Sequence, residues 1–138
     1  MVGHILITYS AYYKVHYPPP TRILHNVFRA ADKVYGYFDG AAQNRNCGGG
    51  FSIYRDSSFV CFGIRGGGKG TNTKAELLGI WTLLMWARQL GIQCISVMGD
   101  SKMIIDWLNC LCVIKNITHT HRCDRMRALD KTFTEIEF

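Results

Sequence analysis

Residues 34–44 read VYGYFDGAAQN, and this stretch decides how the rest of the chain is interpreted. Valine, tyrosine and phenylalanine favour extended backbone, so residues 34–39 are predicted to form a strand that ends at Asp39. The residue that follows is Gly40, and Asp-Gly is a common turn pair. Asp39 is therefore either a turn residue or part of a site, and only the surrounding sequence can separate the two interpretations.

The sequence after this stretch continues as a succession of strand and helix patterns. The predicted strands are residues 34–39, 48–56, 58–65, 94–100 and 134–138, with a hairpin turn at residues 56–58, and the predicted helices are residues 73–90, 101–109 and about 121–133. Gly91 provides the stop after the long helix. The strand at residues 94–100 is nearly all apolar, so we expect it to be central and covered on both faces. This order predicts an α/β fold in which helices pack on a mixed sheet.

Residues 1–33 differ from the rest of the chain and are interpreted as an N-terminal extension or linker, followed by one domain at residues 34–138. Pro18–Pro20 cannot join a helix interior or a central strand, so they indicate a stiff extended segment or a boundary. Apolar residues between Ile23 and Ala31 recur at helical spacing, and Thr21 could cap a short amphipathic helix there. A disordered appendage is the alternative.

Composition narrows the class of protein. The chain has 138 residues, 48% of them hydrophobic, and a formal net charge of +6, which suits one domain with a polyanionic partner. No apolar run approaches the roughly 20 residues that cross a bilayer, and residues 1–10 lack the features of a leader. We therefore expect an intracellular, nuclear or cytoplasmic protein that is monomeric and has no membrane contact.

The six cysteines are irregularly spaced, which favours free thiols over a disulfide framework. A zinc site is the alternative for one cluster: Cys110, Cys112, His119, His121 and Cys123. One residue separates the first pair, whereas structural zinc sites usually leave two to four, so the pattern favours free thiols.

Residues 63–71, GIRGGGKGT, stand between a predicted strand and a predicted helix, where a phosphate-binding loop would lie. The residue after Lys69 should be Ser or Thr to hold Mg²⁺, and it is Gly70, with Thr71 one position late. The pattern therefore favours a mobile glycine-rich connection, and a nucleotide hydrolase stays a third, remote alternative.

Three acids stand at informative positions: Asp39 and Asp100 at the ends of strands, and Glu76 in the first turn of the long helix. Each has a structural alternative, since Asp39 suits a turn, Glu76 fits a capping box that starts at Thr73, and Asp100 or Ser101 could cap a helix. If the strands are neighbours, however, the three carboxylates come together, and such a cluster is stable mainly when cations neutralise it. Hard oxygen ligands suit Mg²⁺ or Mn²⁺, and two such ions about 4 Å apart can hydrolyse a phosphodiester. A basic chain with this centre predicts a nuclease.

Four segments together resemble a known family: YFDGAAQN (37–44), the glycine run before FSIY (51–54), TNTKAELLGIWTLLMWA (71–87) and ISVMGDSKMIIDWLN (95–109). They are similar to the ribonuclease H fold, particularly the reverse-transcriptase-like ribonuclease H domains that are abundant in plants and derived from retrotransposons. The resemblance covers about residues 35–138. It implies a five-stranded mixed sheet of order 3-2-1-4-5 whose first three strands are antiparallel.

The same resemblance implies endonucleolytic cleavage of the RNA strand of RNA–DNA hybrids, leaving 3′-hydroxyl and 5′-phosphate ends. Asp39, Glu76 and Asp100 would be the first three metal-binding carboxylates, holding two Mg²⁺ or Mn²⁺ ions without a small-molecule cofactor. The family has a fourth acid after its fifth strand, and the sequence given ends at Phe138, where that segment should begin. We expect a C-terminally truncated or relic domain, so a catalytically weak or inactive nucleic-acid-binding module is the alternative function.

Substrate contacts follow from the same segments. The small residues at Gly40 and Ala41, with Asn44, would let an RNA backbone approach, and Asn72 and Thr73 at a helix start offer groups that suit phosphates. Lys102 and three arginines of the last helix, Arg122, Arg125 and Arg127, are further candidates for backbone contacts, against the alternative of an ordinary solvated face.

Overall fold

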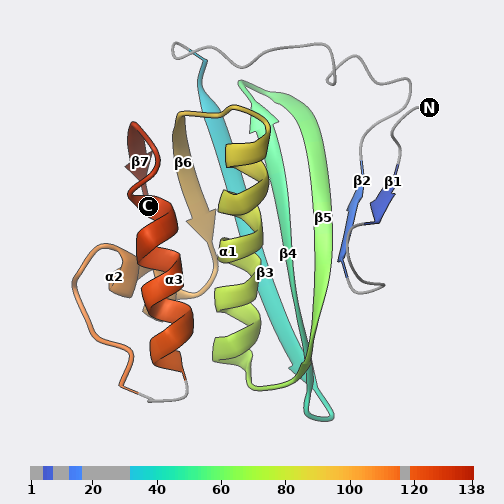
Figure 1. Ribbon diagram of the computed structural model, residues 1–138, viewed down its shortest axis with the longest axis vertical. Coiled ribbons are helices and arrows are strands. Elements are labelled where there is room, and N and C mark those ends of the chain that lie inside the picture. Colours follow the sequence, from blue (N-terminus) through green and yellow to red (C-terminus); the bar gives the residue numbers. More distant parts are fainter. Residues whose placement is uncertain (1–4, 8–12, 17–31, 116–118) are drawn as a thin grey trace.

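The computed structural model (Figure 1) describes residues 5–7, 13–16, 32–115 and 119–138. Its strands are β1 (Ile5–Ile7), β2 (Tyr13–His16), β3 (Val34–Gln43), β4 (Asn46–Arg55), β5 (Ser58–Lys69), β6 (Cys94–Gly99) and β7 (Glu135–Glu137). Its helices are α1 (Asn72–Gln89), α2 (Lys102–Leu108) and α3 (Thr120–Asp130). Helices α1 and α3 contact each other and lie on one face of the sheet in Figure 1.

The sheet has the order β1-β2-β5-β4-β3-β6-β7. Counted from β3, its last five strands have the order 3-2-1-4-5, as predicted. Strands β3, β4 and β5 are antiparallel neighbours, whereas β6 is parallel to β3 and β7 is parallel to β6. The predicted mixed sheet is therefore confirmed.

Strand β3 does not end at Asp39, which corrects the prediction. It continues to Gln43, because residues 39–43 pair in register with residues 46–50 of β4. The chain reverses at Asn44 and Arg45, whose φ angles of 53° and 67° suit a two-residue hairpin turn. The turn interpretation of Asp39-Gly40 is thereby excluded.

Strand β5 also runs further than predicted. Residues 66–69, expected in a loop, continue the strand, and Lys69 pairs with Asn46 of β4. The Lys74 side chain fastens this end of the strand, since its Nζ donates to the carbonyl oxygens of Gly67 at 2.6 Å and of Lys69 at 2.7 Å. The glycine run is thus held in the sheet, and its backbone is not arranged as a phosphate-binding loop.

Helix α1 is capped at both ends by residues with identifiable roles. Thr71 is the N-cap, and its hydroxyl accepts a hydrogen bond from the backbone N–H of Lys74. At the other end, Gly91 adopts a φ of 81°, which a glycine reaches without strain, and this confirms the predicted stop.

Three glycines bring α1 into backbone contact with the sheet. A Cβ atom added to Gly49 would lie 2.4 Å from the backbone nitrogen of Gly79, and one added to Gly40 would lie 2.3 Å from the carbonyl carbon of Ala75. A Cβ atom on Gly79 would in turn lie 2.5 Å from the carbonyl oxygen of Asp39. No larger residue fits at these positions, so the first turns of α1 rest directly on β3 and β4.

Strand β6 lies inside the sheet, between β3 and β7, as expected. Its side chains alternate, however: Ile95 and Val97 are buried, whereas Ser96 and Met98 are partly exposed. The expectation that β6 is covered on both faces is therefore wrong. The hydrophobic core lies on the side of the sheet that α1 covers, and Ile53, Ile80 and Leu83 are fully buried there.

The N-terminal segments add to the sheet. Strand β1 pairs with β2, and β2 pairs with the free edge of β5, both antiparallel. Pro18–Pro20 and the helix predicted after Thr21 lie outside the described residues, and the division into residues 1–33 and 34–138 stays a prediction. Among the described residues, no helix is long and apolar enough to cross a membrane.

The glycine contacts make a testable prediction. We expect Gly49→Ala to lower the free energy of unfolding by about 2–3 kcal/mol, because the new methyl group overlaps the backbone of Gly79 and forces α1 away from the sheet. Urea denaturation measures this loss.

Gly50→Ala is the matched control for this variant. It changes the next residue of the same strand, where a Cβ atom would meet nothing nearer than the Gly63 carbonyl oxygen at 3.4 Å. We expect its effect to stay within about 1 kcal/mol. Equal losses in the two variants would contradict the proposed packing constraint.

Candidate active site

Asp39 lies in the interior of β3, and its side chain is exposed. The neighbouring Phe38 and Gly40 point to the opposite face, toward the core and α1, because successive strand residues alternate between the two faces. One oxygen of Asp39, Oδ1, accepts a hydrogen bond from the Gly40 N–H at 2.8 Å. This hydrogen bond holds the Asp39 side chain in place, so the position of its other carboxylate oxygen is also restricted.

Asp100 follows directly after β6, and its side chain is also exposed. Phe38 of β3 pairs with Gly99 of β6 in parallel register, so Asp39 and Asp100 are the next residues along two adjacent strands. Asp100 does not cap α2, because the N-cap is Ser101, whose hydroxyl accepts from the Ile104 N–H. The capping alternative for Asp100 is excluded, and its carboxylate is not used by the helix.

Both acids line one hollow on the sheet surface. The cavity has a volume of about 300 Å³ and is lined by Tyr37, Phe38, Asp39, Gly50, Phe51, Ser52, Met98, Gly99 and Asp100. Two of the lining residues, Gly50 and Gly99, have no side chain that could fill the hollow. The carboxylates of Asp39 and Asp100 therefore line a depression in the surface that a ligand can enter.

Glu76 approaches the two aspartates from α1. The capping-box interpretation is wrong, because the N-cap is Thr71 and not Thr73, and Glu76 therefore lies beyond the capping positions. Its Oε2 is buried and has no hydrogen-bond partner among the described residues. A buried carboxylate oxygen without a donor is costly, so this atom is a candidate to bind a cation.

The surroundings of Glu76 shift its pKa. Burial is the main cause that raises the pKa of Glu76 to about 7, and the negative charges of Asp39 and then Asp100 raise it further. The charges of both aspartates therefore act on Glu76, which lies near enough to both of them for this effect. The metal-binding role of the three residues stays a prediction.

The three side chains do not yet form a metal site in this structure. Within the described part of the chain, no group of three or more His, Cys, Asp or Glu side chains is arranged to hold an ion. Like charges repel, so three carboxylates that are held close together are stabilised by a cation. Their donor set of hard oxygens, together with the unpartnered Oε2 of Glu76, nevertheless fits Mg²⁺ or Mn²⁺.

The residues predicted to contact nucleic acid differ in whether their side chains are exposed or already bonded within the protein. Gly40, Ala41 and Asn44 lie along the end of β3 and the turn after it, and Ala41 and Asn44 are exposed. The side-chain oxygen of Asn72, in contrast, accepts from the Ala42 N–H at 3.0 Å. Asn72 therefore ties the start of α1 to β3.

Thr73 and Lys102 occupy the first turns of their helices. Thr73 is partly exposed in α1. Lys102 is exposed at the start of α2, but its Nζ lies 2.5 Å from Oδ2 of Asp106 in the same helix. Its charge is thus partly balanced within the protein, which makes Lys102 a weaker phosphate contact than the sequence suggested.

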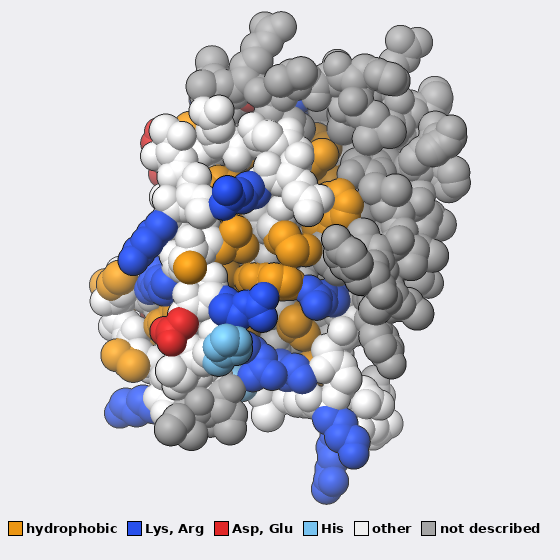
Figure 2. Space-filling model, in the orientation of Figure 1, with side chains coloured by type: hydrophobic (Ala, Val, Ile, Leu, Met, Phe, Trp, Pro, Cys, Tyr) orange, Lys and Arg blue, Asp and Glu red, His pale blue; other side chains and the backbone are white. Residues whose placement is uncertain are grey.

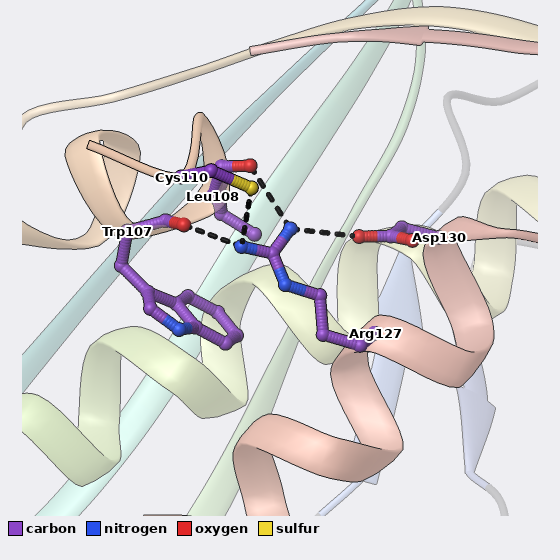
Figure 3. A network of polar contacts seen from close by, with 5 residues as sticks. All are labelled: Trp107, Leu108, Cys110, Arg127 and Asp130. Carbon is purple, nitrogen blue, oxygen red and sulfur yellow. Dashed lines mark hydrogen bonds and ion pairs between the residues drawn. The ribbon is translucent and has the colours of Figure 1, made fainter. Parts of the chain in front are cut away.

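Arg127, a candidate for contacts to the nucleic-acid backbone with a solvated face as the alternative, has a structural role. Figure 3 shows its guanidinium group reaching the end of α2, where it donates to the carbonyl oxygens of Trp107 and Leu108, the latter at 2.9 Å. It also pairs with Asp130 at 3.2 Å, and it lies over the Trp107 ring. Arg127 therefore fixes α2, the helix that begins beside Asp100, and the sequence offered no signal for this role.

The cysteine and histidine cluster has no metal-site geometry. Cys110 and Cys112 are exposed, Cys123 is half-buried and His119 is buried. No combination of these side chains forms a metal-binding group in the described ranges, 32–115 and 119–138.

Comparison with known proteins shows which family the chain resembles in sequence and which solved structures it resembles in fold. The sequence profile of the reverse transcriptase-like family matches residues 37–138. The structure is similar to that of ribonuclease H1 from Halobacterium salinarum, with 25% sequence identity and a TM-score of 0.72, over 76% of this chain and 82% of that chain.

Two further solved structures show the same fold. The N-terminal ribonuclease H domain of a Mycobacterium tuberculosis protein has 23% identity and a TM-score of 0.73, over 78% of this chain and 81% of that chain. A ribonuclease H1 isolated from compost, solved in complex with an RNA/DNA hybrid, has 18% identity and a TM-score of 0.71, over 77% of this chain and 83% of that chain. The chain belongs to the reverse transcriptase-like family and has the fold of ribonuclease H.

Proposed function

We propose that this protein is a ribonuclease that hydrolyses the RNA strand of RNA–DNA hybrids with the help of Mg²⁺ or Mn²⁺. The observation that carries the proposal is the buried, unpartnered Oε2 of Glu76 beside two further carboxylates. A site of this kind gains stability from a divalent cation. Membership of the family and the ribonuclease H1 neighbours support the reaction class.

The carboxylates have distinct parts in the proposed mechanism. Asp39, exposed in the hollow and oriented by the Gly40 N–H, would hold the divalent ions together with Glu76 and Asp100. Bound ions would supply an activated water and stabilise the leaving oxygen of the phosphodiester. The protein would supply the fixed positions of these oxygens, since each acid is held by a strand, a helix or a capped turn.

The substrate assignment rests on shape and charge. Ala41 lies on the same face of β3 as Asp39 and has a small, exposed side chain, so a sugar-phosphate backbone could approach β3 next to Asp39. The net charge of +6 attracts a polyanion of any sequence. A ribonuclease H1 of the same fold was solved with an RNA/DNA hybrid, which supports a hybrid as the ligand of this site.

A nucleic-acid-binding module with weak or no catalysis is the second candidate. The observation that favours it is that the three carboxylates are not arranged as a ready metal site in the described residues. Such a module would bind hybrids through the same surface and leave them uncut.

The first test is cleavage of a labelled RNA–DNA hybrid in Mg²⁺ and in Mn²⁺. We expect Asp39→Asn to reduce cleavage by more than about 100-fold, because it removes an ion ligand worth several kcal/mol in the transition state. The control is Asp56→Asn, which changes an exposed acid in the hairpin turn between β4 and β5 and should cleave like the unchanged protein. Binding without metal-dependent cleavage would favour the module, and neither binding nor cleavage would contradict both functions.

The second test uses the pH dependence of stability. Glu76 has a pKa of about 7 in the folded protein and about 4.5 when unfolded, so folding takes up a proton between these values. Without divalent ions, the free energy of unfolding should therefore fall from pH 4.5 to 7 by more in the unchanged protein than in Glu76→Gln.

Thermal unfolding from pH 4 to 8 measures the difference between these two proteins. We expect Glu76→Gln to be similar to the unchanged protein at pH 4 and more stable at pH 8. Mg²⁺ at pH 8 should then stabilise the unchanged protein more than the variant. A difference in stability between the two proteins that does not change with pH would contradict the raised pKa of Glu76, and with it the effect of burial and of the two aspartates.

A further inference from the structure

Two of the six cysteines lie together at the surface. Cys110 and Cys112 follow the end of α2, with one residue between them, and both are exposed. The other four are buried or half-buried: Cys47, Cys61, Cys94 and Cys123. Burial raises the pKa of the Cys61 thiol to about 12, so this thiol does not ionise near neutral pH. Cys110 and Cys112 are therefore the thiols that a dissolved reagent reaches most readily.

The backbone turns sharply at Cys110. Its φ angle is 63°, in the left-handed region that glycine commonly adopts just after a helix. The Cys110 N–H donates to the Trp107 carbonyl oxygen at 3.0 Å, and the Leu111 N–H donates to the Asp106 carbonyl oxygen at 2.7 Å. These two hydrogen bonds close the end of α2, so the Cys110 side chain extends from a fixed turn.

The sulfur of Cys110 lies next to a cation. Arg127 of α3 directs its Nη2 at Cys110 Sγ, 3.6 Å away, while its other contacts hold the end of α2 (Figure 3). Asp130 pairs with the same guanidinium group at 3.2 Å and balances part of its charge. The thiolate is the form of cysteine that attacks other sulfur atoms, and cationic neighbours stabilise it. Cys110 therefore has the surroundings of a reactive thiol.

Cys112 is held against the same helix and near a second cation. Its Sγ donates to the carbonyl oxygen of Met103 in α2 at 3.5 Å. The hydrogen bond and charge of Asp106 are the main causes that raise the pKa of Lys102, and the charge of Cys112 raises it further. The turn after α2 thus brings the second thiol back toward the helix, beside the first.

The two sulfurs are close enough in the chain to join. Residues two positions apart have Cα atoms no more than about 7 Å apart, and disulfides usually span Cα distances of about 4.4–6.8 Å. The left-handed turn at Cys110 shortens this distance relative to an extended chain. Because one thiol is tethered beside the other, closure is an intramolecular reaction with a high effective concentration.

The charge of the surface suits an anionic oxidant. Lys and Arg side chains are spread over the helix-covered face, where few Asp and Glu side chains are seen (Figure 2). The chain has a net charge of +6. Small disulfides such as glutathione disulfide carry carboxylates, so the positive field raises their concentration near the protein.

We propose that Cys110 and Cys112 form a reversible dithiol–disulfide pair that low-molecular-weight disulfides oxidise. The Cys110 thiolate attacks one sulfur of the small disulfide, and the other half leaves as a thiolate. The Cys112 thiolate then attacks Cys110 Sγ in this mixed disulfide and releases the second small thiolate. Two electrons pass from the cysteine sulfurs to the small disulfide, and the two cysteine protons go to the released thiolates. This inference does not depend on the proposed function.

The test treats the full chain, folded and reduced, with glutathione disulfide. Trypsin cuts after Lys102 and Lys115 and releases residues 103–115, a peptide that contains Cys110 and Cys112 and no other cysteine. After the remaining thiols are alkylated, we expect this peptide to carry no alkyl group and to be two hydrogen atoms lighter than its dithiol form. Dithiothreitol should restore the dithiol form.

Variants and unfolding assign the parts of the two thiols. Cys112→Ser should stop at the mixed disulfide and keep one glutathione on Cys110, because it has no second thiol. Cys94→Ser, which changes a half-buried cysteine of β6, is the control and should close the pair like the unchanged protein. The unchanged protein should react about threefold faster when folded than in urea, because only the folded chain places Arg127 beside Cys110.

Several results would overturn the pair. They are a 103–115 peptide that keeps both thiols in excess glutathione disulfide, one glutathione on each cysteine, or a disulfide between two chains. Equal rates in urea and in buffer would overturn the part assigned to Arg127. Each of these results leaves the ribonuclease proposal intact, since the three carboxylates are unchanged in all of these proteins.

Discussion

The architecture depends on the contact between the backbone of α1 and the backbones of β3 and β4. Gly40, Gly49 and Gly79 make this contact, and a single Cβ atom at any of them would overlap a neighbouring main chain. The hydrogen bond from Ala42 to the Asn72 side chain fixes the start of the helix at the same place. Because the helix lies so close to the sheet, a glutamate on its second turn comes near acids that belong to two strands.

That closeness has an electrostatic consequence. Glu76 is half-buried where the charges of Asp39 and Asp100 also act, and both effects make its carboxyl group hard to ionise and raise its pKa to about 7. The same arrangement that destabilises a lone carboxylate favours divalent cations, which would offset the negative charges of the three acids. The close packing of α1 on the sheet therefore underlies both the fold and the proposed metal binding. Arg127 in addition holds α2, the helix that begins next to Asp100, in place.

Much of this could be predicted from the sequence, and the failures have physical causes. The alternation of strand and helix patterns predicted helices on a mixed sheet, the resemblance to the ribonuclease H fold implied the five-strand order, and the three acids were found from their positions at element ends. The sequence pattern started α1 at Thr73, whereas the N-cap is Thr71, because the tie from Asn72 to β3 that extends the helix start is a tertiary contact. The ends of β3 and β5 were missed since glycine is a poor strand former, and only pairing with β4 keeps those residues extended. The structural role of Arg127 could not be predicted from the sequence, because this side chain donates to backbone oxygens of another helix.

The central claim is that Asp39, Glu76 and Asp100 together hold divalent cations. Anomalous X-ray diffraction from crystals grown with Mn²⁺ tests it most directly, because the signal reports the position of the ion without assumptions about activity. The account predicts a peak in the hollow beside Asp39, within about 2–2.5 Å of carboxylate oxygens from Asp39 and at least one of Glu76 and Asp100. A crystal that holds Mn²⁺ only elsewhere, or whose three carboxylates stay apart at saturating Mn²⁺, would contradict it.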